Sequence, residues 1–222
     1  MRRPDAAVFE VLETIFPLEG LRPRLASLGL AGELDLFFTR VLRDALALDA
    51  SGTFVAFREV ASGSLEVLAA QRGLSPDRSA LEAVLAGFRT LDPHPDVRPA
   101  MERLREAGIA VATLSNGGVE VTRPLLERAG LLPLVSRVMG ADEVRRYEPA
   151  REVYLHASGT LGLPPGRVAM ISVHAWELEG ARSAGLVTGW ASRLEKRYHP
   201  AMRPADVSGA DLVAVAEGLA GL

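Results

Sequence analysis

Several carboxylates lie just beyond apolar segments of this chain, where they could take part in chemistry. Glu10 and Glu13 follow an apolar run that starts at Ala6. Glu177 follows a second such run, and Glu148 stands directly before a proline. A carboxylate can attack carbon as a nucleophile, and several carboxylates together can bind a hard cation such as Mg²⁺ or Ca²⁺. These positions therefore suggest a nucleophile, a cation site, or both.

Hydroxyl, amide and imidazole side chains accompany the carboxylates. Ser115 and Asn116 end an apolar run, and Gly117 favours a tight turn after it. Ser115 could present its hydroxyl, with neighbouring backbone N–H groups, to an anion. Ser172 ends another run, and His174 follows two residues later. His174 is either a general base or a histidine that fills a polar position at the end of a strand.

Strands and helices alternate through most of the chain, which predicts how these side chains are brought together. Expected strands span 6–12, 109–114, 134–139, 168–172 and 187–192, and expected helices span 97–107, 118–129, 150–162, 175–184 and 209–220. This alternation is typical of an α/β fold with a parallel sheet covered on both faces. Ligands of such sheets bind beyond the carboxyl ends of the strands, where the polar residues above are expected.

Residues 17–91 have a different pattern. Apolar residues recur at helical spacing from Leu21 to Leu30, Leu34 to Leu48, Phe54 to Ala70 and Ser79 to Phe88. The prolines between Leu91 and Asp96 indicate a non-helical return segment. We therefore expect a helical cap domain over 17–91, inserted into an α/β core domain made of 1–16 and 92–222.

Composition excludes several classes of protein. The chain has 222 residues, 48% of them hydrophobic, and no cysteine, so disulfides and thiolate sites are excluded. A formal charge of −3 with interspersed signs gives no nucleic-acid footprint. No apolar run is long enough for a membrane span, and the N-terminal residues do not resemble a signal peptide, so we expect a cytoplasmic protein without membrane association. Lys196 is the only lysine.

Four segments carry the candidate residues in a fixed order: Phe9 to Phe16, Thr113 to Gly117, Val144 to Tyr154 and Ile171 to Ala181. Their order, spacing and residues resemble the four motifs of the haloacid dehalogenase superfamily, most closely its 2-haloacid dehalogenase branch. The resemblance covers essentially the whole chain. It implies a Rossmann-like three-layer core with an inserted helical cap, a homodimer, and hydrolysis of the carbon–halogen bond of a small 2-halo acid.

The resemblance also implies roles for individual residues. The positions that match catalytic ones are Glu10, Thr14, Ser115, Asn116, Glu148, Ser172, His174 and Glu177. The positions expected to line the substrate are Leu12, Glu13, Arg40, Tyr154 and Trp176. Leu12 stands where phosphatases of the superfamily carry a second Asp, which favours a dehalogenase ancestry because a halide leaves without a proton.

The residues central to the family's chemistry are replaced. Glu10 stands for the nucleophilic Asp, Glu148 for a Lys and Glu177 for a final Asp, while His174 stands for an Asn. Each Asp-to-Glu change lengthens the side chain by one methylene. Glu148 also reverses the charge of the family's Lys, and Arg146 is a poor substitute because a guanidinium differs from an ammonium in shape and reach.

A cluster of glutamates creates an electrostatic problem. Two carboxylates about 5 Å apart repel by roughly 3 kcal/mol at an effective dielectric near 20. Protons, an arginine or a cation such as Mg²⁺ could relieve this, although no cofactor is required by the residues themselves. Three functions stay open: a non-catalytic member that binds a small molecule or regulates, an active hydrolase with Glu10 as nucleophile, and a metal-dependent hydrolase that uses the glutamates.

Overall fold

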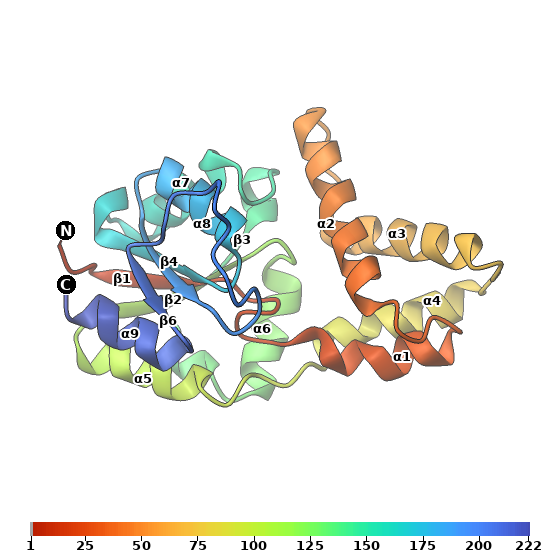
Figure 1. The fold of residues 1–222 in the computed structure, drawn as a ribbon, viewed down its shortest axis with the longest axis horizontal. Helices are drawn as coiled ribbons and strands as arrows, with labels where there is room; N and C mark the ends of the chain where they lie inside the picture. Colours follow the sequence, from red (N-terminus) through yellow and green to blue (C-terminus); the bar gives the residue numbers. More distant parts are fainter. Residues whose placement is uncertain (1) are drawn as a thin grey trace. The chain divides into compact units, whose positions relative to one another are not determined.

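The computed structural model describes residues 2–222, which form two compact units. One unit comprises Met1–Phe16 with Pro93–Leu222, and the other comprises Pro17–Asp92 (Figure 1). Asp92, which was expected in the α/β core, lies in the second unit.

A six-stranded parallel sheet forms the centre of the larger unit, which confirms the expected α/β fold. Its strands are β1 (Ala6–Phe9), β2 (Ala110–Ser115), β3 (Arg137–Gly140), β4 (Val168–Ser172), β5 (Val187–Ala191) and β6 (Val207–Gly209). Their order is β3-β2-β1-β4-β5-β6. The short strand β6 was not expected. The strands β2 and β3 are added on one side of β1, and β4, β5 and β6 are added on the other side. The strand order therefore reverses between β1 and β4.

The register of β1 aligns the strand ends that carry the polar residues. Phe9, the last residue of β1, lies opposite Thr113 of β2 and Ile171 of β4. The Glu10 amide still donates to the Ile171 carbonyl at 3.0 Å. Beyond it, the amides of Ile15 and Phe16 both donate to the Val11 carbonyl and turn the chain. The strand therefore ends at Phe9 rather than at residue 12.

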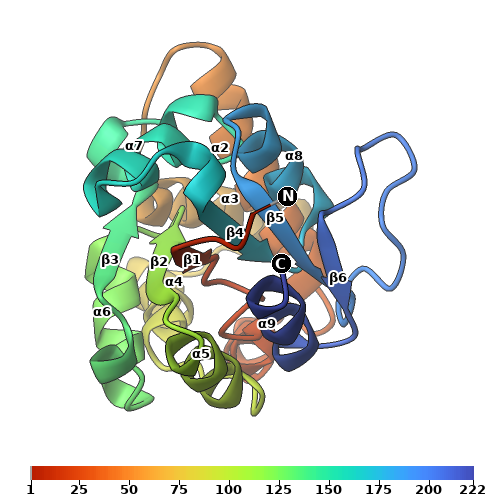
Figure 2. The same cartoon turned by 90° about the vertical axis from the view of Figure 1, so that its left-hand side faces the viewer.

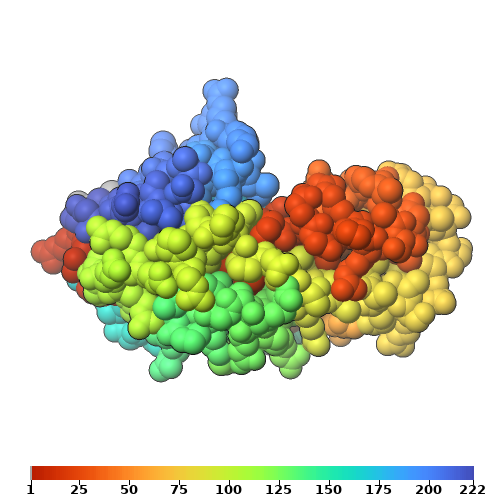
Figure 3. Space-filling model, turned by 90° about the horizontal axis from the view of Figure 1, so that it is seen from below, coloured from red at the N-terminus to blue at the C-terminus, as the bar shows by residue number. Residues whose placement is uncertain are grey.

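Helices cover both faces of the sheet (Figure 2). On one face lie α5 (Val97–Glu106), α6 (Val119–Arg128) and α9 (Leu212–Ala220), and on the other lie α7 (Arg151–Leu161) and α8 (Ala175–Ser183). This is the arrangement that right-handed crossovers produce when the order of a parallel sheet reverses. The helices α5 and α9 lie side by side, as the space-filling view shows (Figure 3). The loop between β5 and β6 projects from the edge of the unit (Figure 2).

The core between the sheet and α7–α8 consists of fully buried apolar side chains. Val8, Leu114 and Met170 project from three adjacent strands, and Tyr154 and Leu178 meet them from the helices. Burying such side chains is the main source of stability for a sheet covered by helices. It also fixes the positions of the strand ends, where the polar residues lie.

The smaller unit is helical. It contains α1 (Arg22–Ser27), α2 (Leu34–Ala50), α3 (Phe57–Gln71) and α4 (Arg78–Leu85). Phe88 joins the helices, because its ring centroid lies 6.4 Å from that of Phe37 and 5.7 Å from that of Phe57. The first helix is shorter than expected, since Leu18–Leu21 forms a separate 3₁₀ segment and the turn after Ser27 ends the regular helix.

Further 3₁₀ segments span Ala86–Arg89, Leu132–Leu134, Ala141–Val144 and Pro165–Arg167. Across residues 2–222, none of the helices is long and apolar enough to cross a membrane.

Candidate functional site

The candidate residues gather where the strand order reverses. Glu10 follows β1, Ser115 ends β2 and Ser172 ends β4, and all three strands are neighbours in the sheet. Crevices at such reversals are where ligands of parallel sheets bind. The sheet thereby brings together residues that lie between 57 (Ser115 and Ser172) and 162 (Glu10 and Ser172) positions apart in the chain.

The loop after β1 positions two of the carboxylates. Glu13 has a φ of 72°, a backbone conformation that favours glycine and is uncommon for other residues. The Glu13 carbonyl lies 3.2 Å from Nε2 of His94, and the Thr14 carbonyl accepts a hydrogen bond of 3.1 Å from Arg193. Arg193 is itself held by Asp96 at 2.6 Å. The loop after β1 is therefore held in place by His94 and Asp96, which follow the helical unit, and by Arg193, which follows β5.

His94 and Arg193 were not among the expected site residues. His94 lies between two prolines in the return linker, and Arg193 follows the strand β5. Neither position belongs to a motif, and both act on backbone carbonyls of the β1 loop. Their role is therefore visible only once the fold brings these segments together.

Glu10 is buried, with 4% of its surface exposed. Its Oε2 accepts a hydrogen bond of 3.3 Å from the Thr14 amide. Burial raises the pKa of the Glu10 carboxyl well above its usual range, and the charge of Glu177 raises it further. The imidazole of His174 and the Thr14 contact act in the opposite direction but do not reverse the shift. The environment therefore favours the neutral acid at the position of the family's nucleophile.

His174 lies between two carboxylates. Its Nε2 is 2.9 Å from Glu13 Oε2, and its Nδ1 is 3.3 Å from Glu177 Oε2. Burial lowers the pKa of His174, but the charge of Glu177 and the hydrogen bonds that His174 donates to the Glu13 and Glu177 carboxylates outweigh it and hold the pKa well above the usual value. An imidazolium cannot accept a proton, so general-base chemistry by His174 is disfavoured. The Trp176 ring lies beside it, with centroids 5.6 Å apart.

Glu177 is held by hydroxyl groups from two elements. Ser172 Oγ donates to Glu177 Oε2 at 2.5 Å and accepts a bond of 2.9 Å from the His174 amide. The Tyr154 hydroxyl donates to the Glu177 backbone carbonyl at 2.9 Å. Thr14 completes this side of the site, because its Oγ1 accepts from the Val173 amide at 3.1 Å. Ser172, Thr14 and Tyr154 thus fix the start of α8.

Glu148 is fully buried, and its carboxyl group stands out among the site's described side chains. Within residues 2–222, neither of its oxygens has a hydrogen-bond partner. Its position is set through the backbone, where the Glu148 amide donates to Asn116 Oδ1 at 2.8 Å. Burial raises the pKa of the Glu148 carboxyl well above its usual range, and the charges of Glu177 and Glu10 add to the shift. This carboxyl is therefore held toward its neutral form beside the other two.

Among the described residues, no arginine, lysine or histidine side chain donates a hydrogen bond to the Glu148 carboxyl. The charge of His174 lowers the pKa of Glu148 but does not reverse the rise. Arg146, which is nearby in sequence, pairs with Glu152 at 3.0 Å and is partly exposed. Lys196 is exposed in the segment after β5.

The remaining expected site residues have simpler surroundings. Ser115 is buried, and its Oγ accepts a hydrogen bond of 3.0 Å from the Gly117 amide, which closes the turn after β2. Leu12 is buried in the β1 loop and brings no acid to it. Arg40 lies on α2 in the helical unit, so its role as a substrate-gripping residue stays a prediction.

Three side chains of the site could hold a metal ion together. Glu10, His174 and Glu177 each present one ligand atom, and these atoms lie within 4.8 Å of one another. All three side chains are buried. Carboxylate and imidazole ligands together suit several divalent cations.

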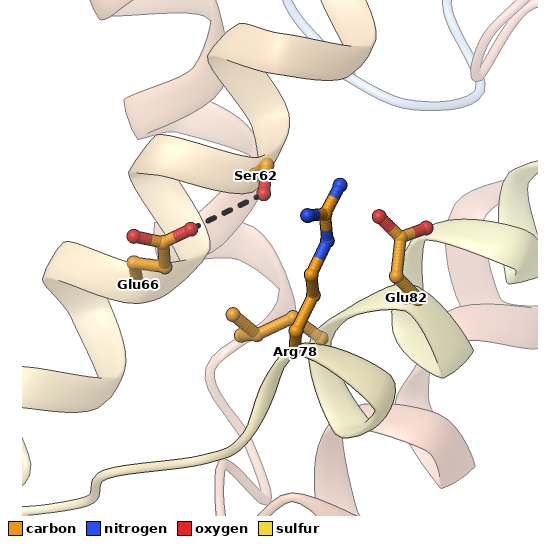
Figure 4. A pocket seen from close by; sticks show the side chains of 5 residues that line it. Ser62, Glu66, Arg78 and Glu82 are labelled. Carbon is orange, nitrogen blue, oxygen red and sulfur yellow. Dashed lines mark hydrogen bonds between the residues drawn. The ribbon is translucent and has the colours of Figure 1, made fainter.

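A separate pocket of about 420 Å³ lies in the helical unit between α3 and α4 (Figure 4). Its lining residues are Ser62, Glu66, Arg78, Leu81 and Glu82. Arg78 projects between the two helices beside Glu82, and Ser62 donates to Glu66 (Figure 4). Arg78 and Glu66 are exposed, so this pocket is a charged surface hollow without the burial seen at the strand ends.

Comparison with known proteins identifies relatives of this chain. The family model of haloacid dehalogenase-like hydrolases matches residues 30–185. The chain is 26% identical over 194 residues to (S)-2-haloacid dehalogenase 1 of a Pseudomonas species, covering 87% of this chain and 82% of that protein. It is 33% identical to (S)-2-haloacid dehalogenase 4A of Burkholderia cepacia, over 50% of this chain and 49% of that protein.

Solved structures show the same fold. The L-2-haloacid dehalogenase of Xanthobacter autotrophicus, with chloropropionic acid covalently bound, superimposes with a TM-score of 0.90 at 21% identity over 99% of both chains. A second L-2-haloacid dehalogenase structure gives a TM-score of 0.82 at 26% identity, over 99% of this chain and 100% of that one.

Proposed function

Because this chain belongs to the haloacid dehalogenase-like hydrolase family, we propose that it is a 2-haloacid dehalogenase-like member that has lost hydrolysis of carbon–halogen bonds and acts by binding. Its relatives are 2-haloacid dehalogenases, so a small anionic molecule is the class of ligand that such a site would inherit.

Glu148 is the observation that carries this proposal. In the related motif a lysine balances the charges of the nucleophile and of the substrate carboxylate. Here the same position holds a buried carboxyl whose oxygens have no hydrogen-bond partner within residues 2–222. An anionic substrate would meet either a neutral acid or a second negative charge. In the transition state negative charge moves from the attacking carboxylate to the halide. A second negative charge would oppose this, and a neutral acid could offer a hydrogen bond but no positive charge.

Glu10 supports the same conclusion. Only the ionised carboxylate is a nucleophile, whereas burial and the charge of Glu177 raise the pKa of Glu10 and favour the acid. Its additional methylene also moves the attacking oxygen. A misplacement of about 1 Å can lower the rate on the order of 100-fold.

Halide release from (S)-2-chloropropionate and other short 2-halo acids tests this function. We expect no release by the purified protein above a heat-denatured sample, because the Glu10 carboxyl is held toward its neutral form and residue 148 is a glutamate where the related motif has a lysine. A Pseudomonas (S)-2-haloacid dehalogenase assayed in parallel is the positive control.

Turnover by the wild-type protein that disappears in Glu10→Gln would contradict the proposal and support an active hydrolase with Glu10 as nucleophile. Turnover that persists in Glu10→Gln would point to a contaminating enzyme. The expected homodimer stays a prediction, which sedimentation of the purified protein can test.

A further inference from the structure

We propose that Glu10, His174 and Glu177 form a binding site for a divalent transition cation such as Zn²⁺ or Mn²⁺. This proposal deepens the binding function above, since it names a ligand for the same site. The three side chains come from the end of β1 and the start of α8, and each presents one ligand atom within 4.8 Å of the others. All three are buried, so a bound cation would be shielded from water.

Each of the three proposed ligands is oriented by a hydrogen bond with a residue that is not itself among those three. The Thr14 amide donates to Glu10, and Ser172 donates to Glu177. Glu13 contacts Nε2 of His174, which leaves Nδ1 directed toward Glu177. A carboxylate on the remote nitrogen of a metal-binding histidine is the usual arrangement in metalloproteins, because it fixes the ring and its tautomer.

Glu148 provides an independent observation. Its carboxyl is fully buried and, among the described residues, neither oxygen has a hydrogen-bond partner. It lies close enough to Glu10 and Glu177 to be affected by their charges. Buried carboxyl groups are otherwise paired or coordinate metals. Glu148 is therefore the candidate for a fourth ligand, and a cation would relieve the repulsion among the three glutamates.

The mixture of ligands selects the class of cation. Mg²⁺ and Ca²⁺ take oxygen ligands almost exclusively, whereas imidazole together with carboxylate suits Zn²⁺, Mn²⁺ and related ions. Binding would displace the proton from Nδ1 of His174 and the proton of the Glu10 carboxyl into solution. The divalent charge would then replace the imidazolium as the counterion of the glutamates. The chain has no cysteine and only four histidines, so few other sites can compete for such an ion.

Metal binding by the full-length protein tests the proposal. The protein is stripped with a chelator and titrated separately with Zn²⁺, Mn²⁺, Co²⁺, Mg²⁺ and Ca²⁺, while its melting temperature and the bound metal per chain are measured. We expect one transition ion per chain and a rise of several degrees in the melting temperature, because an ion that binds only the native state stabilises it. Mg²⁺ and Ca²⁺ should give a smaller rise or none.

Variants identify the ligands. His174→Asn and Glu177→Gln should each lower the affinity for Zn²⁺ at least tenfold and abolish the visible absorption of bound Co²⁺. Glu10→Gln provides the same test if Glu177→Gln does not fold. The matched controls are His199→Asn, which removes an exposed histidine, and His156→Asn, and both should bind as the wild type does.

Equal affinity in wild type and His174→Asn would overturn the proposal, as would absence of bound Zn²⁺, Mn²⁺ and Co²⁺ or an equal response to Mg²⁺. These outcomes leave the proposed loss of hydrolysis intact. Conversely, halide release by the metal-free protein would overturn that loss and leave the cation site standing, so the two failures are distinguishable.

Discussion

At the scale of single residues, Glu13 and His174 contact each other across 161 positions of the chain. Glu13 has a φ of 72°, a backbone conformation that favours glycine. The His174 Nε2 lies 2.9 Å from the Glu13 carboxylate. A buried imidazolium without this carboxylate would be costly, and so would the carboxylate without the imidazolium. Glu13 and His174 therefore depend on each other.

Glu148→Gln is expected to become more stable relative to the wild type as the pH rises. Burial raises the folded pKa of Glu148 above its unfolded value, so the folded wild type binds more protons. The stability that Glu148 contributes to the wild type is fully present below the unfolded pKa, about pH 4.3. It falls by at most about 1.4 kcal/mol per pH unit as the pH rises toward the folded pKa. Glutamine does not titrate. Urea unfolding of both proteins between pH 5 and 8 measures the difference.

Glu179→Gln is a control in which the stability difference from the wild type should change with pH in the opposite direction. The hydrogen bond from Arg203 lowers the pKa of Glu179, so that carboxylate contributes stability above its unfolded pKa and loses it as the pH falls. A stability difference between wild type and Glu148→Gln that does not change with pH would show that Glu148 is not held toward its neutral form.

At the scale of elements, the approach of α8 to the segment before α7 explains why residue 180 is glycine. A Cβ there would lie 2.5 Å from the Pro149 carbonyl oxygen and 2.8 Å from the Tyr154 ring. Glu148, Pro149 and Glu177 are thus brought together by a contact in which two backbones approach closely.

Gly180→Ala should therefore destabilise the protein. Overpacking costs about 1–3 kcal/mol, which exceeds the gain of about 0.5–1 kcal/mol from replacing glycine within a helix. Gly159→Ala in α7 is the matched control, since nothing lies within 4 Å of its Cβ, and it should stabilise. Thermal unfolding measures both. An unchanged melting temperature in Gly180→Ala would mean that α8 can shift away from Pro149 without loss.

The elements were largely predictable from sequence, whereas their contacts were not. Apolar runs before Glu10 and Ser172 predicted β1 and β4 because buried parallel strands are continuously apolar. The three-residue strand β6 is too short to give such a pattern. The Glu13–His174 contact joins residues 161 positions apart. A positive φ is predictable at a glycine, but nothing in the sequence indicates it at Glu13. The site residues were identifiable through motifs, but their pairing required the fold.

At the scale of the whole molecule, the fold matches that of an L-2-haloacid dehalogenase over 99% of both chains. We therefore expect that dehalogenase chemistry can be restored by substitution at the site alone. The combination Glu10→Asp, Glu148→Lys and Glu177→Asp, together with Glu13→Gly and His174→Asn, should release halide from (S)-2-chloropropionate. Catalytic groups act as a unit, so each single variant should remain inactive.

Glu148→Lys alone should fold, because its ammonium would lie beside Glu10 and Glu177. Circular dichroism and thermal unfolding of this variant check that expectation. If it unfolds, the buried Glu148 is required by the fold itself, and restoration by substitution at the site is excluded.

The two tryptophans of this chain both lie against the site. The Trp176 ring is 5.6 Å from the His174 ring, and the Trp190 indole donates to the Val173 carbonyl at 3.1 Å. A protonated imidazole quenches the emission of an adjacent indole, whereas Trp190 reports on the polarity around the end of β4. The intrinsic fluorescence of the unlabelled protein is consequently an optical readout of the charge and occupancy of this site, without contributions from tryptophans elsewhere.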